Sequence, residues 1–98
     1  MNPSEIIAKL HANAVALKGR GVRHMSLFGS RARGNNSHDS DIDLAVELDA
    51  AAGLSGYDIV GLERDLEVLL GARVEIVVVP VRRPSLSHEI ERDGVRAF

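Results

Sequence analysis

Gly29-Ser30-Arg31-Ala32-Arg33-Gly34, followed by Ser40-Asp41-Ile42-Asp43-Leu44, is the stretch that decides the fold of this 98-residue chain. A glycine-serine turn that leads into a helix presents backbone N–H groups to phosphate oxygens. Two aspartates separated by one residue of a strand place both carboxylates on one side of a sheet, where they can bind divalent cations. A phosphate-binding turn beside metal-binding carboxylates predicts a site for a nucleoside triphosphate.

The segments on either side of the turn predict two strands. Residues 22–28 form a short run between glycines, and we expect a first strand there. The segment 35–40 is a polar loop that follows a brief helix ended by Gly34. Residues 41–48 alternate strictly, which places one set on an apolar face (Ile42, Leu44, Val46, Leu48) and the other on a polar face (Asp41, Asp43, Ala45, Glu47).

Two longer helices are predicted around these strands. Residues 4–18 carry apolar side chains at helical spacing, with Ser4 as the expected N-cap. The segment 55–58 resembles a capping box, and it opens a leucine-rich helix that ends at Gly71. Gly61 within this helix costs about 1 kcal/mol relative to alanine, so we expect close packing there. A short helix is expected over residues 85–92.

Residues 73–79 are almost all β-branched and predict a third strand, apolar on both faces and therefore buried on both sides. A glutamate in such a strand, Glu75, must pair with a cation or become protonated. If this strand neighbours the 41–48 strand, Glu75 is a third carboxylate on the metal side. A salt bridge to Arg73 or Arg31 is the structural alternative.

The order of elements is helix, strand, turn and helix, strand, helix, strand, short helix. This order predicts an α/β (α+β) fold, with a small mixed β-sheet flanked by helices. We expect residues 1–98 to form a single domain, because the chain is too short for a second hydrophobic core.

Composition excludes several classes of function. The net charge of −2 argues against non-specific nucleic-acid binding, and the absence of cysteine excludes disulfides and thiolate metal sites. No apolar run is long enough to cross a membrane, and the first residues lack a secretory pattern. We therefore expect a cytoplasmic protein that has no membrane association and works with a partner or as an oligomer.

The chemistry of the motif can be estimated from its spacing. Two residues of strand span roughly 6.6–6.8 Å, so the carboxylates of Asp41 and Asp43 can reach two metal ions about 3.5–4 Å apart. Arg31 and Arg33 are planar donors suited to triphosphate oxygens. The alternatives are a solvated face of an edge strand for the aspartates, and an ordinary serine-capped turn with two surface arginines for residues 29–33.

The combination Gly29-Ser30, ten residues, then Asp41-x-Asp43 resembles the signature of the DNA polymerase β-like nucleotidyltransferase superfamily. The Gly-Ser-Arg-Ala-Arg-Gly form, in so short a chain, resembles the minimal nucleotidyltransferase (MNT) proteins, antitoxins whose toxin is a HEPN-domain ribonuclease. The resemblance implies that Gly29 and Ser30 bind the phosphates of ATP and that Asp41 and Asp43 hold two Mg²⁺ ions. The third carboxylate of the family, usually aspartate, would be Glu75.

The resemblance further implies transfer of AMP from ATP to a hydroxyl group, expected to be a tyrosine, of a HEPN-type toxin partner. In that reaction Glu75 would be a metal ligand or would orient or deprotonate the hydroxyl. One alternative is a non-catalytic antitoxin that neutralises the toxin by binding alone. Another is nucleotidyl transfer to RNA or a small molecule, although nothing in the chain resembles an added substrate domain and no direct nucleic-acid contact is expected.

Overall fold

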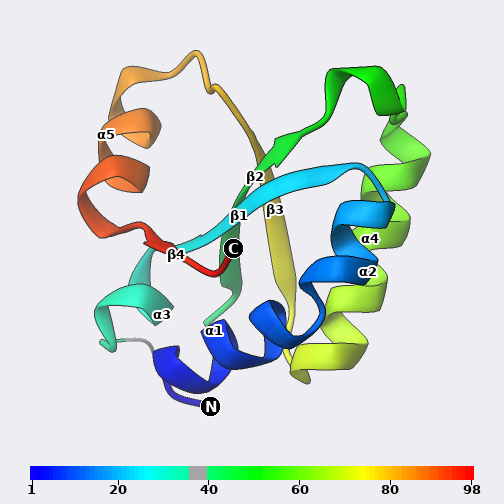
Figure 1. Cartoon of the computed structure of the whole chain (residues 1–98). Coiled ribbons are helices and arrows are strands. Elements are labelled where there is room, and N and C mark those ends of the chain that lie inside the picture. The colour runs from blue at the N-terminus through cyan, green and yellow to red at the C-terminus, as the bar shows by residue number, and fades with distance from the viewer. Residues whose placement is uncertain (36–39) are drawn as a thin grey trace.

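The computed structural model describes residues 1–35 and 40–98, so the polar loop expected at 35–40 is described only at its two ends. Figure 1 shows the elements, in chain order α1 (Pro3–Ala12), α2 (Ala14–Gly19), β1 (Val22–Phe28), α3 (Ser30–Arg33), β2 (Ile42–Leu48), the 3₁₀ turn η1 (Ala50–Ala52), α4 (Gly56–Leu70), β3 (Val74–Val79), α5 (Pro84–Asp93) and β4 (Val95–Arg96).

The strands form one mixed sheet in the order β3-β2-β1-β4. β1 runs antiparallel to both β2 and β4, whereas β2 and β3 are parallel. The α/β class and the mixed sheet flanked by helices are therefore confirmed. β4 was not predicted, because two residues carry too short a pattern to indicate a strand.

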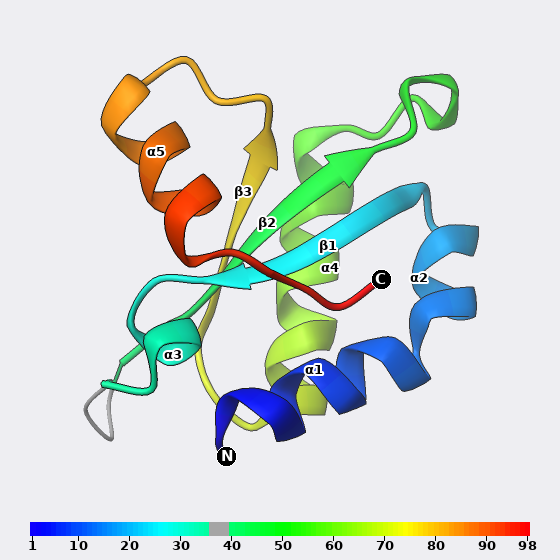
Figure 2. The ribbon, with the colours of Figure 1, turned by 60° about the vertical axis from the view of Figure 1, so that its left-hand side comes forward.

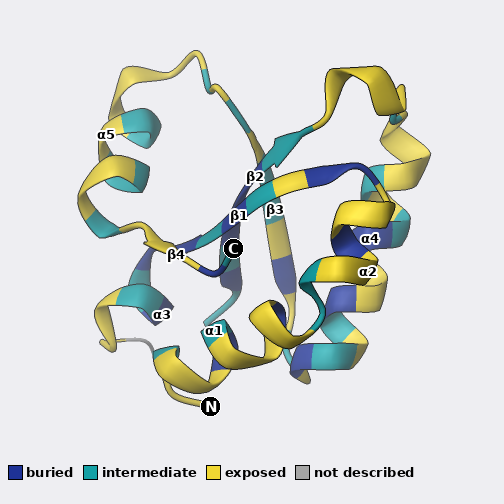
Figure 3. Cartoon of the chain, viewed as in Figure 1, coloured by how far each residue is buried: buried dark blue, intermediate teal, exposed yellow. Residues whose placement is uncertain are grey.

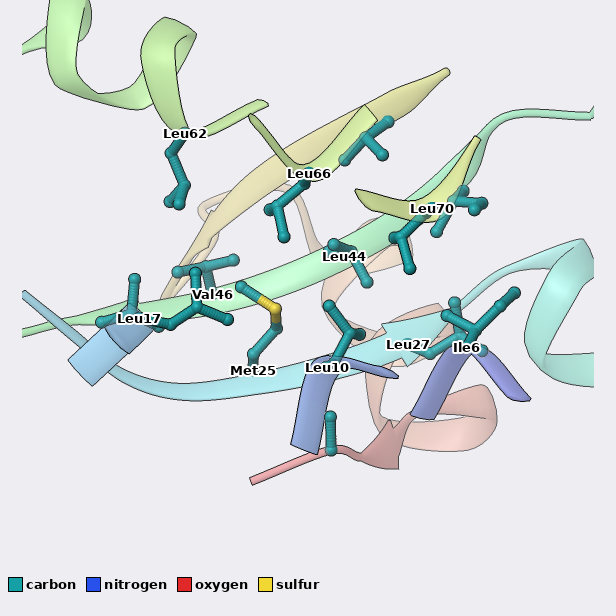
Figure 4. Packing of buried hydrophobic residues seen from close by; sticks show 14 residues of the cluster. Ile6, Leu10, Leu17, Met25, Leu27, Leu44, Val46, Leu62, Leu66 and Leu70 are labelled. Carbon is teal, nitrogen blue, oxygen red and sulfur yellow. The ribbon is translucent and has the colours of Figure 1, made fainter. Parts of the chain in front are cut away.

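Helices cover the two faces of the sheet unequally. Leucines of α1, α2 and α4 pack against alternate residues of the strands, and Figure 4 shows Leu10, Met25, Leu44 and Leu66 at the centre of this core. α5 lies on the opposite face. Its Ile90 and Ala45 of β2 line the same hollow, and Ala45 points away from the core because it follows the core residue Leu44 in the strand. Figure 2 shows α4 and α5 on the two sides of the sheet. The polar face of β2 is therefore only partly covered.

The N-terminal helix differs from the prediction in two ways. It is divided at Asn13, whose side chain donates a hydrogen bond of 2.8 Å to the Lys9 carbonyl and so ends α1. Its N-cap is Asn2 rather than Ser4, because Asn2 accepts the Glu5 N–H at 2.9 Å and Glu5 accepts the Asn2 N–H in return. Pro3 then occupies the first turn of the helix, where its missing N–H costs nothing.

The leucine-rich helix begins and ends as the sequence indicates. Ser55 and Asp58 form the expected capping box, and Gly71 ends α4 in the left-handed conformation with φ +67°. The expectation for Gly61 is wrong. A Cβ at Gly61 would meet only the tip of Arg20, at 3.9 Å, so α4 does not pack closely there.

β3 is less buried than predicted. We expect from the sequence that both of its faces are covered, but β3 lies at the edge of the sheet and part of it is exposed. Val74 is buried, but Val78 is 41% exposed and Glu75 is exposed. Figure 3 shows the exposed residues along this edge of the sheet. A run of β-branched residues indicates a strand but not the number of neighbouring strands. Here β3 is the first strand in the sheet order, and among the described residues no strand pairs with its outer edge. In the described residues no helix is long and apolar enough to cross a bilayer.

Candidate active site

The turn between β1 and α3 is built around Gly29. Its φ of +77° and ψ of −157° are accessible to glycine and strained for other residues. Gly29 is the N-cap of α3 and Ser30 is the first helical residue, so the serine-capped turn given above as an alternative does not form. An added Cβ on Gly29 would lie 2.5 Å from Oδ2 of Asp43. The backbone of the turn thus approaches the Asp43 carboxylate as closely as a glycine permits.

The three predicted carboxylates lie at one end of the sheet. Asp43 is paired with Phe28 on β1 and with Glu75 on β3, so the side chains of Asp43 and Glu75 are neighbours on the same face. Asp41 comes directly before β2, and its carboxylate lies 3.8 Å from Nε of Arg73. The predicted adjacency of the two strands is therefore confirmed, with Arg73 facing Asp41 rather than Glu75.

The carboxyl group of Asp43 lies near three other negatively charged side chains. Partial burial is the largest cause of a raised pKa at its carboxyl, followed by the negative charges of Glu75, Asp41 and Glu89, while Arg33 acts in the opposite direction. Together these effects raise the pKa of Asp43 from 3.8 to about 6. Since every cause but one disfavours the ionised form, the fold maintains an electrostatic cost that a bound cation would remove.

The chemical type of these side chains, carboxylates, suits a hard divalent cation. Carboxylate oxygens are the preferred ligands of Mg²⁺, and Gly29 leaves the space beside Asp43 open. Within the ranges 1–35 and 40–98, however, no three acidic or histidine side chains already converge on a common ion position. The carboxylates of Asp43 and Glu75 are therefore neighbours in the sheet, but the described side chains do not form a ready-made metal centre.

Arg31 does not face solvent, as a surface arginine would. It is 8% exposed, and its Nε and Nη2 donate to the Ser40 carbonyl at 3.2 and 2.9 Å. Two donors of one planar guanidinium thus hold the residue immediately before Asp41. Arg31 ties the turn at Gly29 to the start of β2.

The model of the family described as "Polymerase beta, Nucleotidyltransferase" matches residues 12–98. The chain belongs to this family. It is 35% identical over 92 residues to the protein adenylyltransferase MntA of Thermococcus cleftensis. The aligned region covers 93% of this chain and 91% of that protein.

Two solved structures resemble this nucleotidyltransferase closely in fold. One, of a protein assigned as a minimal nucleotidyltransferase, has a TM-score of 0.78 and 33% identity over 97% of this chain and 95% of that one. The other is a toxin–antitoxin crystal structure with AMP-PNP, which has a TM-score of 0.70 and 26% identity over 100% of this chain and 73% of that one.

In this nucleotidyltransferase, Arg33 connects the site to the C-terminal helix. Its Nη1 lies 2.6 Å from Oδ2 of Asp93, a side chain that is 7% exposed and also contacts Arg92 at 3.0 Å. Hydrogen bonds from Arg92 and then Arg33 lower the pKa of Asp93. Arg33 therefore anchors the end of α5 beside α3, and still acts on Asp43 through its charge.

One acidic residue near the nucleotidyltransferase site was missed in the sequence. Glu89 lies on the partly buried side of α5, and its charge contributes to the raised pKa of Asp43. The helical spacing of Leu86, Ile90 and Asp93 indicates which side of α5 faces inward. It does not indicate that this side lies over the polar face of β2, because that placement depends on the path of residues 80–83.

Proposed function

We propose that this nucleotidyltransferase is an antitoxin that transfers AMP from ATP to a tyrosine hydroxyl of a HEPN-type toxin partner. The observation that carries the proposal is the contact between the Gly29 turn and the Asp43 carboxylate, in register with Glu75. A triphosphate bound at the turn would have its α-phosphate beside acidic side chains that bind cations. The match to an adenylyltransferase over 93% of this chain and the match to a toxin–antitoxin structure with AMP-PNP support the same activity.

The chain's own residues have separate tasks in this reaction. The backbone N–H groups at Gly29 and Ser30 bind phosphate oxygens, and Arg33 adds positive charge on the same side. The sequence predicts that Arg31 contacts the triphosphate. Its burial and its hydrogen bonds to the Ser40 carbonyl add a second role, in which Arg31 positions the start of β2. Two Mg²⁺ ions held by Asp41, Asp43 and Glu75 would neutralise the triphosphate and polarise the α-phosphate.

Glu75 is the residue best placed to accept the proton. It is exposed, so an incoming hydroxyl can reach it, and it lies beside Asp43. The hydroxyl oxygen forms a bond to the α-phosphorus, the bond from that phosphorus to the bridging oxygen breaks, and pyrophosphate leaves. The hydroxyl proton passes to the Glu75 carboxylate. The products are the AMP ester of the acceptor and pyrophosphate.

The second candidate is an antitoxin that acts by binding alone. Glutamate in place of the family's usual aspartate favours it, because Glu75 carries one more methylene and metal sites tolerate misplaced ligands poorly. The two candidates differ in whether protection from the toxin requires the carboxylates.

Incubation with ATP, Mg²⁺ and the product of the neighbouring gene, followed by intact-mass spectrometry, tests the proposal. We expect the partner to gain one or more AMP units with the wild type, none with Asp43→Asn or Glu75→Gln, and an unchanged gain with Glu91→Gln. Glu91 is an exposed residue of α5 and provides the matched control. An unmodified partner that is nevertheless neutralised by Glu75→Gln as well as by wild type would establish the binding-only antitoxin instead.

A further inference from the structure

The outer face of α4 carries apolar side chains that no described part of the chain covers. Tyr57 is 92% exposed, and Val60, one turn further along the helix, is 47% exposed. Beside them, a broad hollow of about 680 Å³ is lined by Gly56, Tyr57, Val60, Gly61 and Arg64. This volume lies within the ~300–1,000 Å³ that is typical of binding sites. The hollow is therefore ample for one aromatic side chain of another molecule.

Arg64 lines this hollow and has an uncompensated charge. Within residues 1–35 and 40–98 it makes no ion pair. The acidic residue next to it, Asp65, pairs instead with Arg20 at 2.6 Å. A guanidinium in this position can bind the face of an aromatic ring or a carboxylate supplied from outside the chain.

The outer edge of β3 is the other surface at which a second chain could add, but side chains of α4 already occupy it. Oε2 of Glu67 accepts the Val74 N–H at 3.1 Å, and Oε2 of Glu63 accepts the Ile76 N–H at 3.4 Å. Charged side chains along an edge strand oppose the addition of a further strand. The outer face of α4 is therefore the more open surface of the two.

This face is complementary to itself, because a projecting ring and a hollow lie on one helix, four residues or about 6 Å apart. A two-fold axis between Tyr57 and Gly61, with two α4 helices antiparallel, would place each Tyr57 over Gly61 of the second copy and beside its Arg64. The same operation brings the end that carries Asp58 towards the end that carries Arg64. Both capping hydrogen bonds to Asp58 are made by Oδ2, so Oδ1 can accept from that arginine.

The catalytic carboxylates lie on the other side of the sheet. Asp43 and Glu75 share the face on which α5 lies, whereas α4 packs on the apolar face (Figure 2). A protein acceptor bound at these carboxylates would therefore leave Tyr57 uncovered. We propose that the outer face of α4 docks a second copy of this chain, with each Tyr57 seated in the hollow of the other copy. The two active sites of this dimer face outward.

Sedimentation velocity of the full chain over a concentration series tests the dimer. We expect a concentration-dependent monomer–dimer equilibrium for the wild type. Tyr57→Arg sets a like charge beside Arg64 of the second copy and should raise the dimer dissociation constant about tenfold or more. His88→Arg adds the same charge to an exposed position of α5 and should leave this constant unchanged. Circular dichroism should show the same fold for both variants, since Tyr57 is 92% exposed.

The double variant Tyr57→Arg/Arg64→Glu tests whether the two positions meet across the axis. They are two helical turns apart and do not contact each other within one helix. Association that is weak in each single variant and restored in the double variant therefore supports contact between copies.

A wild type that stays monomeric at every concentration, or an equal dissociation constant for wild type and Tyr57→Arg, would overturn the proposal. A monomeric wild type whose binding to the product of the neighbouring gene is weakened by Tyr57→Arg would assign this face to that protein instead. None of these measurements depends on AMP transfer, so the dimer can fail while the proposed function holds, and the reverse.

Discussion

The ionised carboxylate of Asp43 is expected to destabilise the metal-free protein, so Asp43→Asn should raise its stability. The change keeps the shape of the side chain and removes its charge from beside Glu75, Asp41 and Glu89. The same substitution should abolish AMP transfer. A gain of stability together with a loss of activity would identify Asp43 as a residue retained for its chemistry.

The magnitude follows from the pKa. A shift from 3.8 to about 6 corresponds to about 3 kcal/mol at 1.36 kcal/mol per pKa unit. Because the side chain is partly exposed, solvent screening reduces this to roughly 1–2 kcal/mol. The folded protein has the raised pKa and binds its proton more tightly than the unfolded chain does. The stabilisation is therefore complete below about pH 4 and is lost as pH rises to about 6.

Urea unfolding of wild type and Asp43→Asn between about pH 4 and pH 8, at low salt with EDTA, measures this difference. We expect equal free energies of unfolding at the acid end and a variant about 1–2 kcal/mol more stable above pH 6, which is a rise in Tm of at least ~4 °C. Glu91→Gln should show no such trend. A difference between wild type and Asp43→Asn that stays constant over this pH range would refute the electrostatic reasoning.

Three further substitutions test other parts of the fold. Gly61→Ala should raise the free energy of unfolding by about 1 kcal/mol in chemical denaturation, since only a distant arginine tip meets the new methyl group. Gly29→Ala should lower stability by roughly 1–3 kcal/mol and weaken ATP binding measured by calorimetry, because of its positive φ and the approach of Asp43. Arg31→Lys should lower kcat more than it raises the KM for ATP, because a lysine cannot make the paired donation to Ser40.

Part of the site could be predicted from the sequence because its pattern is local. The alternation of residues 41–48 places Asp43 on the polar face. Gly29 follows the first strand, in a backbone conformation that only glycine adopts without strain. The parallel pairing of β2 with β3 follows from the helix between them, and it brings Glu75 beside Asp43. These features need only neighbours in sequence and one crossover connection.

The partners of the arginines could not be predicted. Arg33 contacts Asp93, sixty positions further along the chain, and Arg31 is buried against the Ser40 carbonyl. A sequence indicates that a guanidinium suits phosphate, but equally that it suits a carboxylate or a carbonyl. Which partner it meets depends on how α5 returns across the sheet.

The amino-acid sequence alone determined the identity of the chemistry: a glycine turn, two aspartates at strand spacing and a capped leucine-rich helix, all set by steric and hydrogen-bonding preferences within a few residues. Only the tertiary structure decided that β3 is an edge strand with Glu75 exposed, and that Glu89 adds its negative charge near Asp43. The physical reason is that burial, charge–charge interaction and cavity shape depend on distances in space between segments far apart in the chain, which no local pattern encodes.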